Sequence, residues 1–220
     1  MPFSPLVLLA LLFLLSLLLV FVQLGLISIT LAKLGLSPNS AMTLLLVSVT
    51  GSLINLPLFK IEAVQPTNPP ITPRLLSLLR QRMPPFTGQT TIAMNVGGCM
   101  VPIIFSLYLL LNNPLPMLDV LLAIVIVSGI SFFSSRPIPG LGIGMPILIA
   151  PLMAAAVALL LNPELSAPLA YIGGTLGVLI GADLLRLKDI RRMGTPVAAI
   201  GGAGTFDGIF ITGIVAVILA

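Results

Sequence analysis

Residues 167–187 read APLAYIGGTLGVLIGADLLRL, an apolar run in which a single acid, Asp183, precedes the first basic residue. The run is close to the ~20 residues that a membrane-spanning helix needs. The whole chain has the same character, because 58% of its 220 residues are hydrophobic and only 7% are charged. Soluble domains carry about 25% charged residues. Ten basic and six acidic side chains cannot cover a water-facing surface, so we expect an integral membrane protein.

The composition also excludes several kinds of chemistry. The chain has no histidine, which excludes a Ser-His hydrolase and a His-ligated zinc site. Cys99 is the only cysteine, so an internal disulfide and a cysteine-based metal site are excluded as well. We therefore expect no cofactor and no metal. The excess of basic residues is expected to set membrane topology and not to bind nucleic acid.

Apolar runs that recur along the chain predict an all-α polytopic membrane protein with about seven transmembrane helices. Residues 1–220 are expected to form a single transmembrane domain, and residues 60–90 its cytoplasmic loop. Nine of the ten basic residues then fall on one side, which places the N-terminus in the cytoplasm and the C-terminus outside. The expected location is the cell membrane, with the lipid bilayer as partner and the oligomeric state open. The expected spans are roughly 7–31, 41–59, 91–111, 116–133, 142–161, 167–187 and 205–220.

Two acids, Asp183 and Asp207, lie inside otherwise apolar stretches. A carboxylate costs about 2.5–3.5 kcal/mol at the centre of a membrane helix, so such residues usually serve a function. Gly194-Thr195-Pro196 and the glycines of residues 201–204 disfavour a helix, which predicts extended backbone at 197–200 and a cavity beside Asp207. Both aspartates are candidate catalytic residues. The candidates for substrate binding or for shaping the loop are Gly201, Gly202, Gly204, Thr205, Gly208 and Asn95.

Gly173, Gly177 and Gly181 recur every four residues in the sixth expected span. This spacing predicts a ridge of small residues that packs closely against a neighbouring helix. Asp183 is two residues past Gly181, about 200° further round a helix. The carboxylate is therefore expected to face a different neighbour from the glycine ridge.

The two aspartates, the second preceded by Gly202-Ala203-Gly204, resemble those of presenilin, signal peptide peptidase and their prokaryotic relatives. These GxGD-type intramembrane proteases carry a Gly-x-Gly-Asp motif, whereas here Thr205-Phe206 intervenes before the aspartate. The resemblance implies a presenilin-like core, Asp183 and Asp207 as a catalytic diad, and transmembrane helices as substrates. Over its full length the chain looks more like an uncharacterised prokaryotic multi-pass family. The phrases that carry this second likeness are residues 95–98, 180–183 and 201–210.

Three functions stay open on these residues. In a hydrolase, the diad activates water to cleave a membrane-embedded peptide. In a proton- or sodium-coupled transporter or channel, the same acids beside broken helices bind the ion. The third function is a non-catalytic membrane scaffold. It gives no role to two isolated acids that have no basic partner in their spans.

Overall fold

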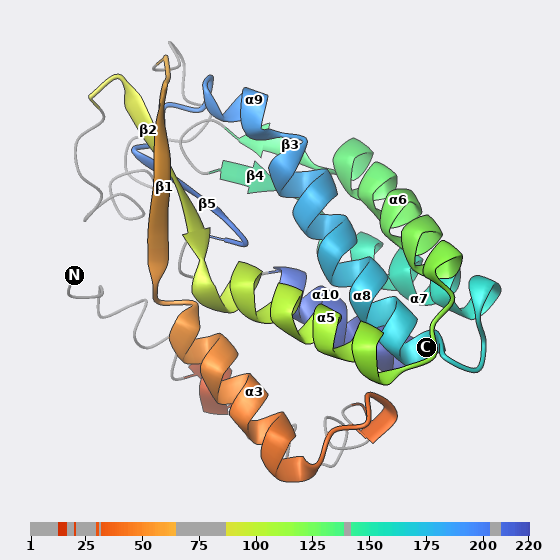
Figure 1. Cartoon of the computed structure of the whole chain (residues 1–220). Coiled ribbons are helices and arrows are strands. Elements are labelled where there is room, and N and C mark those ends of the chain that lie inside the picture. Colours follow the sequence, from red (N-terminus) through yellow and green to blue (C-terminus); the bar gives the residue numbers. More distant parts are fainter. Residues whose placement is uncertain are drawn as a thin grey trace.

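The computed structural model describes residues 13–16, 20, 30, 32–64, 87–138, 142–202 and 208–220. One buried helix, α8 (Ser166–Val178), lies at the centre of the helical part, and all but one of its residues are buried. Four helices surround it, and α3 (Pro38–Gly51) packs beside one of them, α5 (Figure 1). The four are α5 (Val101–Asn112), α6 (Met117–Ser134), α7 (Ile149–Leu161) and α10 (Gly208–Leu219).

Glycine allows α8 to approach α6 closely. A Cβ added at Gly173 would lie 3.0 Å from the Cβ of Ala123, and one at Gly177 would lie 2.7 Å from the Cβ of Val127. A Cβ at Gly181 would overlap the Ser128 carbonyl oxygen. The predicted glycine ridge is therefore confirmed, and its neighbour is α6.

The strands of the described residues form two sheets beside the helices. The first has three strands in the order β1 (Asn55–Glu62), β2 (Gln89–Asn95) and β5 (Val197–Ile200), side by side at one end of the helical bundle (Figure 1). β1 is antiparallel to β2, and β5 is parallel to it. The second sheet is a short antiparallel pair, β3 (Arg136–Ile138) and β4 (Gly142–Gly144). The predicted extended backbone at 197–200 is confirmed by β5.

The predicted all-α fold with about seven transmembrane helices is wrong. Strands form two sheets, and in the described part of the chain only two helical segments are long and apolar enough to cross a membrane, Met117–Ser134 and Ser166–Leu184. Part of the expected span 41–59 is β1, and the expected span 91–111 begins as β2. Pro57 cannot continue the helix, and Thr90, Thr91 and Ile92 are β-branched residues that favour a strand.

The other expected boundaries correspond to the structure to different degrees. α6 covers the residues expected at 116–133, and α10 begins at Gly208 within 205–220. The expected span 142–161 opens with β4, so its helix is only 13 residues long. The expected span 167–187 is α8 followed by the π-helix η2 (Leu179–Leu184) and by α9, a helix of four residues (Leu187–Ile190). The expected span 7–31 and residues 65–86 of the expected loop lie almost wholly outside the described residues.

The outer surface of α6 is apolar and exposed. Only 28% of its membrane-length window is buried inside the protein, and the exposed fractions of Phe133 and Val125 are 82% and 66%. Large contiguous apolar surfaces are rare on soluble monomers and mark contact with a membrane or a partner. Two apolar helices of sufficient length and this surface support a membrane location.

Candidate functional site

The candidate site is built around Asp183, which lies in the π-helix η2. A π-helical turn contains an extra residue and often occurs at functional sites. Gly181 fixes this turn against the backbone of α6, on the opposite side from the Asp183 carboxylate. The side chain is half-buried, and its Oδ2 accepts a hydrogen bond of 2.7 Å from the Gly201 N–H. As predicted, the carboxylate faces a neighbour other than α6.

The donor of that bond belongs to a glycine turn that follows β5. Gly201 and Gly202 have φ values of +81° and +90°. Residues other than glycine rarely adopt this backbone conformation, because their Cβ atom would clash with the backbone. A Cβ at Gly201 would also lie 2.6 Å from the Gly98 carbonyl carbon and 2.7 Å from the Cβ of Cys99. Only glycine fits here, so the turn brings its N–H close to the carboxylate.

Asn95 holds the backbone segment that packs against the glycine turn. Its side-chain amide donates to the Ser52 carbonyl oxygen at 2.7 Å and to the Asn55 Oδ1 at 3.0 Å. Its own Oδ1 accepts from the Gly98 N–H at 2.7 Å, at the start of the π-helix η1 (Val96–Met100). Gly98 in turn packs directly against the Gly201 carbonyl. Asn95 therefore contacts the site through Gly98, and it does not line the cavity.

A cavity of about 380 Å³ opens beside Asp183. Its walls come from β4, η2, β5 and the first turns of α10, together with Val178 of α8, Ile190 of α9 and Met193. β4 and β5 are each the terminal strand of their sheet among the described residues, so each has an open edge. Thr195 adds a polar group, since its hydroxyl is buried and has no hydrogen-bond partner within the described part of the chain.

The sequence-predicted site residues are only partly brought together. Asp183, Gly201 and Gly202 lie at the cavity or contact the carboxylate that lines it. Gly208 is the first residue of α10, whose Ile209 and Thr212 line the same cavity. The remaining three, Gly204, Thr205 and Asp207, lie outside the described residues.

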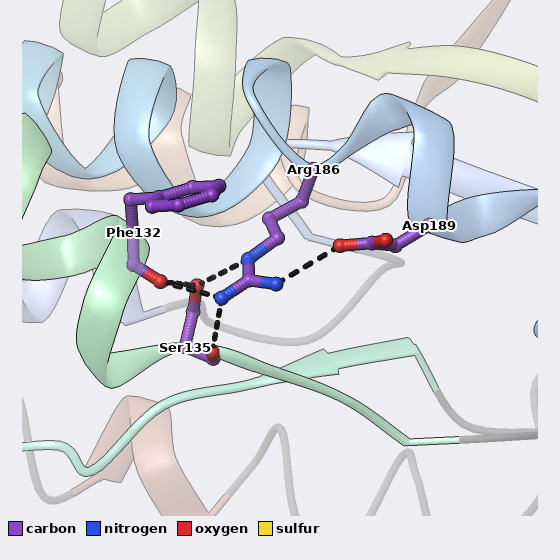
Figure 2. Close-up of polar contacts among 4 residues, drawn as sticks. All are labelled: Phe132, Ser135, Arg186 and Asp189. Atoms are coloured by element: carbon purple, nitrogen blue, oxygen red, sulfur yellow. Dashed lines mark hydrogen bonds and ion pairs between the residues drawn. The ribbon is translucent and has the colours of Figure 1, made fainter.

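Sequence reasoning missed Arg186, which it used only as a marker of topology. The guanidinium donates to the carbonyl oxygens of Phe132 at 2.6 Å and Ser135 at 2.8 Å, and to the Ser135 hydroxyl at 3.2 Å (Figure 2). It also pairs with Asp189 at 3.0 Å and lies 4.3 Å above the Phe132 ring. Arg186 therefore closes the C-terminal end of α6, where carbonyl groups lack helical partners. Because it follows Asp183 by three residues, it also fixes the end of η2.

The open edge of β4 was missed as well. Gly142, Ile143 and Gly144 were predicted to begin a helix, but they form a strand in the cavity wall. The Gly-x-Gly spacing was the available signal, because glycine is unfavourable inside a helix. Among the described residues no three His, Cys, Asp or Glu side chains form a group that could hold a metal ion.

Comparison with known proteins identifies a family but no activity. No curated protein and no solved structure matches the chain. The model of DUF1614, described as a protein of unknown function, matches residues 49–219, with no accompanying match to a presenilin-type family. The match covers most of the chain and both expected aspartates, and it confirms the expectation of an uncharacterised family. The chain belongs to the DUF1614 family of proteins of unknown function.

Proposed function

We propose that this protein is an intramembrane aspartyl hydrolase that uses Asp183 and Asp207 to cleave a membrane-embedded peptide. One observation carries the proposal. The Asp183 carboxylate lines a cavity and accepts a hydrogen bond from Gly201, the residue that begins the glycine turn leading to Asp207. Ile209, two residues after Asp207 in the sequence, lines the same cavity.

The chemistry follows from two carboxyl groups that share one proton in a low-dielectric site. The ionised carboxylate takes a proton from water while the water oxygen bonds to the peptide carbonyl carbon. The protonated carboxyl gives its proton to the carbonyl oxygen. The carbon–nitrogen bond then breaks, and the leaving amine takes up a proton from the pair. Titration belongs to the pair and not to either residue alone.

An extended peptide is the substrate form that the cavity suits. The open edge of β5 offers backbone hydrogen bonds to an added strand, and β4 offers a second open edge across the cavity. A volume of about 380 Å³ is within the range of small-molecule sites and admits a short segment of peptide. A peptide bond can be hydrolysed only after its helix has unwound, because helical hydrogen bonds protect it.

The proposed location is the cell membrane of a prokaryote, with several passes across it. α6 and the α8–η2 segment end at the same level, since Arg186 joins their ends. Five basic residues follow these two ends directly, whereas Asp119 and Glu164 lie near the opposite ends. The basic end is assigned to the cytoplasm. The five residues are Arg136, Arg186, Lys188, Arg191 and Arg192.

Cleavage of a fluorogenic transmembrane peptide by the full-length protein in liposomes tests the proposal. Asp183→Asn and Asp207→Asn should each abolish cleavage, because neither remaining carboxyl group can act alone. Glu164→Gln is the matched control, since this exposed acid lies far from the cavity and makes the same change of charge. Wild-type protein that cleaves no member of a peptide library contradicts the proposal, as does full activity in either Asn variant.

Ion-coupled transport is the second candidate, and one contact favours it. Two strands, β2 and β5, each lead through a glycine pair into a helix, and the two pairs touch where Gly98 meets Gly201. Ion-coupled carriers place such broken segments beside a membrane-embedded acid. Proton or sodium flux into liposomes that is lost in Asp183→Asn, without peptide cleavage, would favour this function.

A further inference from the structure

A second cavity, of about 390 Å³, lies between the β1–β2 sheet and α9. Its position is fixed by backbone pairing, since the Val64 N–H donates to the Arg191 carbonyl oxygen at 2.8 Å. It is separate from the cavity of Asp183, with which it shares no lining residue. The lining residues are Phe59, Ile61, Ile92, Leu187, Lys188 and Arg191. We call this cavity the α9 groove.

The α9 groove combines an apolar floor with a basic rim. Ile92 is fully buried, whereas Phe59, which also lines the groove, is 50% exposed. Lys188 and Arg191 are exposed, and neither has an acidic partner in the described part of the chain. Such a site suits a molecule with both an anionic group and hydrocarbon.

Among the acids that the structure describes, none opposes the two basic side chains inside the groove. Asp189 is held by Arg186 in an ion pair. Successive strand residues point to opposite faces of a sheet, so Glu62 points away from the groove that Ile61 lines. The groove therefore has a local positive charge that an anion can neutralise.

In the membrane orientation proposed above, on which this step rests, the groove would lie at the level of the phospholipid headgroups. The apolar segment Ser166–Leu184 ends four residues before Lys188. The C-terminal end of α6 lies beside the end of this segment, because Arg186 donates a hydrogen bond to the Phe132 carbonyl oxygen. Basic pockets at the cytoplasmic ends of membrane helices bind anionic lipid headgroups. Arginine can bind a phosphate through two parallel N–H groups, and lysine binds it as a point charge.

We propose that the α9 groove binds an anionic phospholipid, with the phosphate between Lys188 and Arg191 and the upper acyl chain against Phe59 and Leu187. A free phosphate would use the rim but gain nothing from the apolar floor. A zwitterionic lipid would bind more weakly, because the positive charge of its headgroup would be repelled by the two basic side chains of the rim. This inference does not depend on the hydrolase proposal, because it uses neither aspartate.

Native mass spectrometry of the full chain in detergent, titrated with dioleoylphosphatidylglycerol or dioleoylphosphatidylcholine, tests the site. Wild type should retain phosphatidylglycerol in preference to phosphatidylcholine. Lys188→Ala/Arg191→Ala should bind phosphatidylglycerol about 30-fold more weakly, the product of two basic contacts. Lys33→Ala/Arg136→Ala removes the same charge from exposed positions outside the groove and should leave binding unchanged.

Two further variants separate the groove from general surface charge. Lys188→Arg/Arg191→Lys keeps both charges and should retain binding within about threefold. Phe59→Ser keeps every charge and should weaken binding of the lipid by about tenfold, because it removes apolar contact. Equal binding of the two lipids, equal loss in both alanine double variants, or binding of glycerol 3-phosphate as tight as that of the lipid would each overturn the proposal.

Discussion

Two strand-to-helix junctions in this protein each contain a pair of glycines. The side chain that accepts a hydrogen bond from the glycine pair differs between the two junctions. At the first, β2 leads into η1, which contains Gly97-Gly98 and continues into α5, and at the second, β5 is followed by Gly201-Gly202 before α10. The first glycine pair is held by a nearby amide, because the Gly98 N–H donates to Asn95 three residues away. The second is held across the structure, because the Gly201 N–H donates to Asp183. The first junction is held by a neutral local amide and has a structural role, whereas the second is held by a distant carboxylate that lines a cavity and belongs to the proposed hydrolase site.

The largest expected effect comes from adding one methyl group where the junctions touch. Gly201→Ala combines a positive φ with overlap against the Gly98 backbone, and Gly98→Ala overlaps the Gly201 carbonyl. Each should cost about 3–5 kcal/mol of folding stability, measured by chemical unfolding in detergent. Gly129→Ala in α6 is the control, since its Cβ would meet nothing within 4 Å. That variant should be stabilised by about 0.5–1 kcal/mol.

The next variants separate the two junctions by their partners. Asn95→Ala removes an amide that makes three buried or half-buried hydrogen bonds, and it should cost about 2–3 kcal/mol in the same unfolding assay. Asp183→Asn keeps an oxygen that can accept from Gly201 and should change stability by less than about 1 kcal/mol, although it should abolish the proposed hydrolysis. A larger stability loss in Asp183→Asn than in Asn95→Ala would reverse the assignment of structural and functional junctions.

Arg186 should contribute to folding stability through the geometry of its hydrogen bonds as well as through its charge. Arg186→Lys keeps the cation but cannot reach the Phe132 and Ser135 carbonyls with one planar group. We expect a loss of about 1–2 kcal/mol in thermal or chemical unfolding. Arg136→Lys, at an exposed position, should stay within about 0.5 kcal/mol of wild type. Equal effects in the two variants would mean that the contacts with α6 contribute little.

The smallest expected effect is at Thr195. Its buried hydroxyl has no partner among the described residues, so Thr195→Val should change stability by less than about 0.5 kcal/mol. If the hydroxyl binds the peptide substrate, kcat/KM should fall about fivefold, the value of one hydrogen bond of about 1 kcal/mol. Unchanged cleavage kinetics would assign Thr195 to the cavity wall alone.

Local signals in the sequence predicted part of this arrangement. Gly194-Thr195-Pro196 before residues 197–200, and glycines after them, predicted the extended backbone of β5. The spacing of Gly173, Gly177 and Gly181 predicted close packing, and the offset of Asp183 predicted a second neighbour for the carboxylate. These features depend on backbone freedom and helical geometry, which a short stretch of sequence determines.

The sheet could not be predicted in the same way. Leu56, Leu58 and Phe59 are apolar, so periodicity alone does not separate a strand from the end of a membrane helix. The pairing of Thr91 with Val197 joins residues that are far apart in the chain, and no local pattern specifies it. Arg186 was missed for a related reason, because its partners belong to α6 and not to its own helix.

The unequal lengths of the helices have a consequence for the bilayer around them. α6 has 18 residues and a length of about 27 Å, close to the ~30 Å hydrocarbon thickness. α7 has 13 residues, about 20 Å, and its Leu160 is 84% exposed. In the proposed membrane location, lipid that matches the length of α6 would be thicker than the length of α7, and this hydrophobic mismatch would favour a thinner bilayer beside α7. For the proposed hydrolase, a thinner bilayer on that flank would shorten the distance over which water and a polar peptide cross hydrocarbon.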